Sequence, residues 1–470
     1  MKKWAVWGLL LSIGTAAGAK EQGASCHLPN YEHPLRCVAM DVPLDYGSPG
    51  ERLSMHVTVA PALRETARPD PLFVLAGGPG QPGSDIVSLL DSAFRRVRAT
   101  RDIVFIDQRG TGRSGKLTCD GLPDLGSVSD SEDEQALFEC LQKLGKPYRH
   151  YNTANAVRDL DEVRKALGYR RVNVWGGSYG TRLGQAYARA FPDNVRSLVL
   201  DSVASPEQIL GVWGEDAQAS LDAMFVRCDR DDACNKAFPN LRAQFLSLLQ
   251  VVESGQAKLQ FLHPRTAKAV SLTLTRVTFV ETIRIALYSP EMTARLPFLI
   301  KQASEGSWRP FLAQMYTQSD WSLASMAYGL SLAVLCAEDI PRLTPEIIAA
   351  ERENSFLKGI QVERWPRLCP AVSVPESKYQ PPQMIDTPVL LFSGALDPVT
   401  PPRRAETARS HMTHSQHLIV ETLGHGISHL GCGPRLLREF LDAPEQPLNG
   451  HCLNEIPLPP FMLTAAGPQS

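Results

Sequence analysis

The stretch from Arg171 to Phe191 constrains the fold of this chain more than any other. It reads RVNVW, then GGSYG, then TRLGQAYARAF, so an apolar run stops at two glycines and a run of small residues begins after a lone serine. Gly176, Ser178 and Gly180 form the G-x-S-x-G pattern of a nucleophilic serine at a sharp strand-to-helix turn. The glycines let strand and helix approach closely, and the strained turn exposes the hydroxyl. We therefore predict a nucleophile at Ser178 rather than a flexible Gly-Ser loop.

Strands and helices alternate on both sides of this turn. Two continuous apolar runs, Pro71–Ala76 and Ile103–Asp107, are typical of strands that are buried on both faces of a parallel sheet. The apolar residues of Thr153–Leu167 have helical spacing, and Val195–Asp201 follows as a further strand. This alternation predicts an α/β fold with a doubly wound, mostly parallel sheet.

The pattern changes between about Ser205 and Pro382. Helical segments dominate there, one of them predicted over Trp321–Cys336, and the α/β pattern resumes at Pro388. We interpret this part as a mainly helical cap, inserted over the sheet edge where such folds bind ligands. The expected organisation is a signal peptide (1–19), a first α/β part (20–204), the cap (205–382) and a second α/β part with a disulfide-pinned tail (383–470).

The N-terminus predicts export. Two lysines precede an apolar run from Trp4 to Ile13, and small residues end at Ala19 with an A-x-A cleavage pattern. Cys26 lies too far beyond the apolar run to suggest a lipid anchor, and no later run is long enough to span a bilayer. We therefore expect a periplasmic or secreted protein without a membrane anchor.

The predicted export determines how the ten cysteines are interpreted. Their number is even and no C-x-x-C occurs, which in an oxidising compartment favours disulfides over zinc. The most economical hypothesis is five successive local pairs, although spacing cannot settle connectivity. The expected pairs are Cys26–Cys37, Cys119–Cys140, Cys228–Cys234, Cys336–Cys369 and Cys432–Cys452.

Two patterns could suggest a cofactor. Gly110 to Lys116 nearly matches a phosphate-binding loop, but Leu117 follows where magnesium binding needs Ser or Thr, and turn residues replace the required helix. His411, His414 and His417 are evenly spaced but lack a carboxylate or cysteine to complete a metal site. We therefore predict no cofactor and no metal. The formal net charge of −2 gives no indication of a nucleic-acid partner.

A serine hydroxyl needs a base to take its proton and an acid to orient that base. In chain order, Asp397 follows a strand at Val389–Phe392, and His425 follows a strand at His417–Glu421 and lies between two glycines. This is the order expected after an α/β-hydrolase nucleophile. The weaker alternatives are Asp386 and Glu421 for the acid, which lie before or within strands, and His429 for the base, which lacks the glycine pair.

The oxyanion formed by serine attack needs two backbone N–H donors. One is expected from Tyr179, directly after the nucleophile. The other is expected from the loop GGPG after an early strand, where Pro79 has no N–H, so Gly78 is preferred and Gly77 comes second.

Together these motifs resemble the proline iminopeptidase family, and most of all its larger exported tripeptidyl aminopeptidase-like branch. One position departs from the pattern, since Ala76 stands where many iminopeptidases have His before the loop. The resemblance covers both α/β parts well and the cap weakly. It is carried by Val42-Pro43-Leu44-Asp45-Tyr46, Gly77-Gly78-Pro79-Gly80, Asp107-Gln108-Arg109-Gly110-x-Gly112-x-Ser114, Gly176 to Gly180, Asp397 and His425.

The resemblance implies an exported serine aminopeptidase that releases an N-terminal residue, proline among the options, or a short di- or tripeptide. Its expected partner is a peptide with a free N-terminus, whose ammonium group requires a buried carboxylate under the cap. Glu338 is the candidate for this carboxylate, with Glu215 and Asp216 behind it. The alternatives are a carboxylesterase of the same fold and a non-catalytic exported binding protein.

Overall fold

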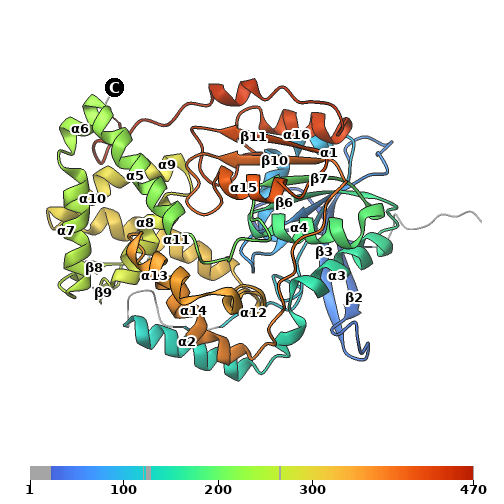
Figure 1. The fold of residues 1–470 in the computed structure, drawn as a ribbon, viewed down its shortest axis with the longest axis horizontal. Coiled ribbons are helices and arrows are strands. Elements are labelled where there is room, and N and C mark those ends of the chain that lie inside the picture. The colour runs from blue at the N-terminus through green and yellow to red at the C-terminus, as the bar shows by residue number, and fades with distance from the viewer. Residues whose placement is uncertain (1–22, 120, 123–128, 264–265, 469–470) are drawn as a thin grey trace, which may run out of the picture.

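The computed structural model describes residues 23–119, 121–122, 129–263 and 266–468, so the predicted signal peptide lies outside the described residues. Within these ranges one large sheet has nine strands in the order β1-β2-β3-β5-β4-β6-β7-β10-β11. Figure 1 shows this sheet on one side of the molecule and the cap helices on the other. The strands are β1 (Ala24–Cys26), β2 (Leu35–Pro43), β3 (Arg52–Ala60), β4 (Leu72–Leu75), β5 (Ile103–Ile106), β6 (Val172–Gly177), β7 (Val195–Asp201), β10 (Val389–Gly394) and β11 (Ser415–Val420).

The direction of the strands identifies the edge where a site is expected. β1, β2 and β3 pair antiparallel, β3 is antiparallel to β5, and from β5 to β11 every pairing is parallel. The chain runs from β4 to β5 on one side and then returns to β6 on the other. The loops after β4 and β6 therefore meet at a topological switch point, where open α/β sheets bind ligands.

Each strand of the parallel part buries both faces. Phe73 and Leu75 pack with α3, α4 and α15, whereas Leu72 and Val74 pack with α1 and α16 on the opposite face. This alternation follows from the two-residue period of a strand. It confirms the predicted doubly wound α/β fold. These helices are α1 (Arg95–Arg98), α3 (Thr153–Ala166), α4 (Tyr179–Ala190), α15 (Pro402–Arg409) and α16 (Gly433–Asp442).

The inserted segment is mainly helical, with one two-stranded hairpin. Its aromatic core includes Phe245, Phe279 and Phe311, whose rings stack in sequence. The hairpin strands are β8 (Lys258–Leu262) and β9 (Ala269–Thr273). The helices are α5 (Gly214–Arg230), α6 (Asp232–Ala237), α7 (Leu241–Glu253), α8 (Arg276–Ala286), α9 (Pro290–Thr293), α10 (Leu296–Ser304), α11 (Arg309–Ser325), α12 (Tyr328–Glu338), α13 (Pro345–Glu353) and α14 (Ile360–Val372).

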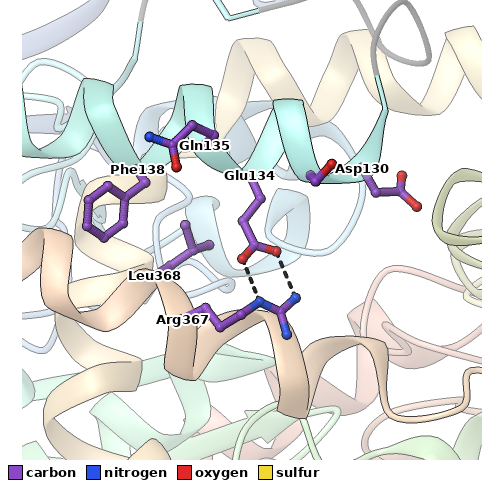
Figure 2. Close-up of a pocket in the computed structure, with 7 residues that line it drawn as sticks. Asp130, Glu134, Gln135, Phe138, Arg367 and Leu368 are labelled. Atoms are coloured by element: carbon purple, nitrogen blue, oxygen red, sulfur yellow. Dashed lines mark hydrogen bonds and ion pairs between the residues drawn. The ribbon is translucent and has the colours of Figure 1, made fainter.

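One helix outside the predicted insertion also joins the cap. α2 (Asp130–Leu144) lies between β5 and α3 in the chain, yet it packs against α14. Glu134 accepts two hydrogen bonds from Arg367 across this contact, at 2.6 and 2.8 Å, beside a surface cavity of about 640 Å³ (Figure 2). The cap therefore draws on the segment after β5 as well as on the insertion.

The prediction of a single helix over Trp321–Cys336 is wrong. α11 ends at Ser325 and α12 begins at Tyr328, because Ala327 leaves helical geometry with φ −96° and ψ 87°. Its amide donates to Gly80 O at 3.0 Å, in the loop after β4. A tertiary contact thus interrupts a segment whose local propensity is continuous.

All five predicted disulfide pairs are present, including Cys119–Cys140, which ties α2 to the segment before it, and Cys432–Cys452 in the tail. In the part of the chain that the structure describes, no helix is both long and apolar enough to cross a bilayer.

Candidate active site

Ser178 lies between the end of β6 and the start of α4, in a strained backbone conformation with φ 55° and ψ −124°. The two flanking positions must be glycine because there is no room for a Cβ atom. A Cβ at Gly176 would lie 2.3 Å from Gly180 O, and one at Gly180 would lie 2.2 Å from Leu75 O. Strain of this kind persists only where the surroundings impose it, and it concentrates at functional sites. Ser178 therefore has the geometry expected of the predicted elbow.

The loop after β4 lies directly beside this serine. A Cβ at Gly77 would lie 3.0 Å from Ser178 Cβ and 3.6 Å from its Oγ. Among the residues that the structure describes, none accepts a hydrogen bond from the backbone amides of Gly78 or Tyr179. Both amides are therefore free to donate to a bound group, and their role in an oxyanion site stays a prediction.

The cap holds this loop from outside. Besides the Ala327 amide on Gly80 O, the Ser331 hydroxyl donates to Pro79 O. The Met326 side chain faces Gly78, since a Cβ at Gly78 would lie 2.8 Å from its terminal methyl carbon. The break between α11 and α12 thus brings cap residues to the edge of the candidate oxyanion site.

The glycine-rich loop after β5, which superficially resembles a phosphate-binding loop, has a structural role here. The Asp107 carboxylate accepts from the Ser84 amide at 2.8 Å and from the Arg113 amide at 2.9 Å. Buried Arg109 forms a two-point ion pair with Asp159 of α3, at 2.6 Å for each contact. The loop therefore braces the segment after the oxyanion loop and joins the sheet to α3.

Asp397 follows β10 and His425 follows β11, and their side chains meet with Nδ1 of His425 2.8 Å from Oδ2 of Asp397. The other oxygen of Asp397 accepts the amides of Val399 and Thr400 at 2.9 and 2.8 Å. The Thr400 hydroxyl donates to Asp397 Oδ2 at 2.7 Å and lies 3.1 Å from His425 Nδ1. The two contacts that reach the imidazole, from Asp397 Oδ2 and the Thr400 hydroxyl, both engage Nδ1, so Nε2 is the nitrogen left for proton exchange with Ser178.

Electrostatics favour a charged pair. Burial alone would raise the pKa of Asp397, but the charge of His425 and the hydrogen bonds from the imidazole and two amides hold it below the ordinary value. Burial alone would lower the pKa of His425, but Asp397 outweighs it and, with a smaller contribution from Asp201, raises the pKa of the imidazole. Arg284 acts on His425 in the opposite sense.

Asp201, at the end of β7, positions the histidine loop and was not singled out from the sequence. Its carboxylate accepts the amides of Ile427 and Ser428 at 2.8 Å each, and its carbonyl accepts the Ser178 amide at 2.9 Å. One residue thus joins the elbow to the loop that carries His425. An acid at the end of a strand next to the nucleophile strand was the available signal.

Among the described residues, Ser178 Oγ and His425 Nε2 do not form a hydrogen bond with each other. Such contacts are often long in unliganded enzymes and tighten in the substrate complex. Of the alternatives, Asp386 is hydrogen-bonded to Thr413 by its carboxylate, at the opposite end of β10 from Asp397.

Glu338 lies at the C-terminal end of α12, whereas the N-terminal end of that helix contacts the oxyanion loop. These ends are about 15 Å apart at 1.5 Å per residue. Its carboxylate accepts the Thr153 amide at 2.8 Å and the Thr153 hydroxyl at 2.7 Å, at the first residue of α3. Burial raises the pKa of Glu338. The structure thus gives Glu338 a role at the N-terminus of α3, and its amine-binding role stays a prediction.

The runner-up acids are also engaged elsewhere. Buried Asp216 pairs with Arg403 at 2.5 Å and Arg404 at 2.9 Å, and exposed Glu215 pairs with Arg403 at 3.1 Å. In the described part of the chain, no group of three or more His, Cys, Asp or Glu side chains could hold a metal ion.

Three curated proteins resemble this chain in sequence. A tripeptidyl aminopeptidase of Streptomyces coelicolor is 32% identical over 238 residues, which cover 46% of this chain and 43% of that protein. The serine protease Hip1 of Mycobacterium bovis is 31% identical over 189 residues (36% of each chain). A proline iminopeptidase of Neisseria meningitidis is 32% identical over 155 residues (33% and 39%). The matched stretches span less than half of each relative, and they confirm the predicted resemblance.

The family described as alpha/beta hydrolase fold matches residues 70–431, which include the elbow, the oxyanion loop, Asp397, the cap and His425. The chain therefore belongs to the α/β hydrolase fold family.

Proposed function

We propose that this protein is a serine aminopeptidase that releases an N-terminal residue or a short di- or tripeptide. Ser178 Oγ attacks the scissile carbonyl while His425 Nε2 takes its proton, and His425 then returns that proton to the leaving amine. Asp397 keeps Nδ1 protonated and stabilises the imidazolium. The amides of Gly78 and Tyr179 bind the oxyanion, and water hydrolyses the acyl-enzyme by the same route.

The observation that carries the proposal is the 2.8 Å contact between Asp397 and His425 at the sheet edge that also holds the strained serine. These three residues come from loops after three different strands, in the chain order of this fold. A lone reactive serine would not need an acid and a histidine held at this edge.

The cap and the matched relatives support action at chain ends. The cap contacts the oxyanion loop at Pro79 and Gly80 and the histidine loop at His425, and these are two of the loops that make up the candidate site. Three relatives carry peptidase names, two of them for N-terminal release. We propose a peptide with a free N-terminus as the substrate on these grounds.

The deciding experiment compares fluorogenic substrates with one, two or three residues, each with a free or an acetylated N-terminus, beside a p-nitrophenyl ester. We expect release from at least one free substrate, none from its acetylated form, and no activity in Ser178→Ala. Ester hydrolysis without peptide hydrolysis would identify the carboxylesterase alternative. Failure of a fluorophosphonate to label Ser178 in folded protein would favour a non-catalytic binding protein.

The proposed amine contact of Glu338 has its own test in Glu338→Gln. If Glu338 binds the ammonium group, KM for free peptides rises at least tenfold while ester hydrolysis is unchanged. If it serves only the start of α3, KM stays constant and thermal stability falls. Thr153→Val is the matched control, since it removes the hydroxyl donor and leaves the carboxylate.

We also propose that the protein is exported, and the five disulfides support an oxidising compartment. Cleavage after Ala19 predicts a mature chain that begins at Lys20. N-terminal sequencing of protein from the periplasm or medium of an expressing bacterium checks this. A chain that retains Met1 in the cytoplasmic fraction would contradict it.

A further inference from the structure

The residues that directly follow cap helix α8 contact the histidine loop. The His425 amide donates to Tyr288 O at 2.7 Å, and the Tyr288 and His425 rings lie 4.8 Å apart between centroids. A Cβ at Gly424 would lie 2.4 Å from the same Tyr288 carbonyl oxygen. The cap therefore fits tightly against the residue proposed as the base.

Tyr288 is in turn held by a buried arginine. Arg284, only 8% exposed, donates through Nη1 to the Tyr288 hydroxyl at 3.0 Å. Its Nε and Nη2 both donate to Glu281 Oε2, at 3.0 and 2.7 Å, and Gln361 donates to the other oxygen of Glu281. The guanidinium also lies over the Trp213 ring, 5.2 Å from its centroid. The contacts thus run from two cap helices to His425.

We propose that Arg284 and Tyr288 are positioning residues for His425, so that the cap helps to set the alignment and the charge of the proposed base. The Tyr288 ring and carbonyl hold the imidazole against Asp397 from the cap side. Arg284 fixes the Tyr288 hydroxyl and directs its positive charge towards the imidazole, with Glu281 on the side of the guanidinium away from Tyr288. This inference rests on the proposed role of His425.

The charged and titratable groups around His425 determine in which direction its pKa should shift when Arg284 is replaced. Asp397 and Asp201 favour the imidazolium, and Arg284 disfavours it. Burial raises the pKa of the Tyr288 phenol, so Tyr288 stays neutral in the working range. Removal of the Arg284 charge should therefore move the ionisation of His425 to higher pH, and the enzyme should lose activity earlier on acidification.

The test measures His425 ionisation in two ways, by the pH dependence of fluorophosphonate inactivation and by NMR titration of ¹⁵N-labelled imidazole. The NMR readout does not require activity, so it stays informative even if the proposed reaction is wrong. Unlabelled Ser178 in the wild type would refute the reaction, whereas the NMR midpoints judge the effect of the Arg284 charge on His425 independently of activity. The His425 signal is assigned with His425→Ala.

We expect a higher midpoint in Arg284→Met and a midpoint near that of the wild type in Arg284→Lys, which retains the charge. Glu281→Gln with Arg284→Met leaves no unpaired buried charge, so it keeps the test available if the single variant does not fold. The double variant should also raise the His425 midpoint, but by less than Arg284→Met alone. Arg276→Met is the matched control, since Arg276 lies on the same helix but pairs with Glu253. Its midpoint should not move.

Variants of Tyr288 distinguish a role in positioning His425 from a role in substrate binding. Tyr288→Ala should lower kcat about ten- to hundredfold with little change in KM, because a misplaced base slows the chemical step. Tyr288→Phe keeps the ring, so its kcat should fall by less than that of Tyr288→Ala. The inference is overturned if folded Arg284→Met titrates like the wild type, or if Tyr288→Ala raises KM and leaves kcat unchanged.

Discussion

The Asp201 carboxylate offers the sharpest test of how the site is built, through the substitution Asp201→Asn. The carboxylate is 2% exposed and accepts two backbone amides at 2.8 Å, from Ile427 and Ser428. A hydrogen bond to a charged group contributes about 1.5–3 kcal/mol, and a neutral one about 1 kcal/mol. The asparagine oxygen can keep one amide, while its NH2 group faces the other donor. The expected loss of unfolding free energy is therefore about 2–5 kcal/mol.

The same substitution should change catalysis in a defined direction. Asp201 helps to raise the pKa of His425, so Asp201→Asn should lower it and move the acid limb of kcat/KM to lower pH. The plateau value of kcat should fall because the loop that carries His425 loses an anchor. Urea unfolding gives the stability, and a pH series with the best free-peptide substrate gives the limb.

The matched control is Ser202→Ala, which removes the hydroxyl that accepts the Gly426 amide at 2.7 Å but removes no charge. It should destabilise the protein by about 1 kcal/mol and leave the acid limb in place. A stability change below about 0.5 kcal/mol in Asp201→Asn, together with an unmoved acid limb, would refute the reasoning.

Three further outcomes are expected. Because the pKa of His425 is raised, and only the neutral imidazole accepts a proton, the acid limb of wild-type kcat/KM should have its midpoint above the ordinary histidine value of 6.5; a midpoint at or below it would contradict the charged pair. Gly424→Ala should lower kcat at least tenfold, since its Cβ would collide with Tyr288 O, whereas Gly50→Ala, with open space around it, should be neutral in the same assay. Ser331→Ala should lower kcat about fivefold at constant KM by releasing Pro79 O, as judged by steady-state kinetics; a rise in KM alone would argue against a role in holding the oxyanion loop.

Local sequence signals determined the framework of this protein. Gly176 and Gly180 are needed wherever a strand turns sharply into a helix, so the elbow around Ser178 can be recognised without any knowledge of distant residues. The apolar runs that become β4 and β5 reflect burial on both faces, and the positions of Asp397 and His425 follow from the strands that precede them. Each of these inferences depends on neighbours in the chain or on chain order.

Contacts between distant segments decided the remaining features. The α11–α12 break exists because Ala327 bonds to Gly80, about 250 positions earlier, and α2 belongs to the cap because it packs against α14. Asp201 and Tyr288 matter because two loops and a cap helix converge on His425, which no local pattern records. Local backbone geometry depends on residues that are close in the chain, so a short segment is enough to predict it. The electrostatic surroundings of a side chain depend on residues that are distant in the chain and that only the fold brings together.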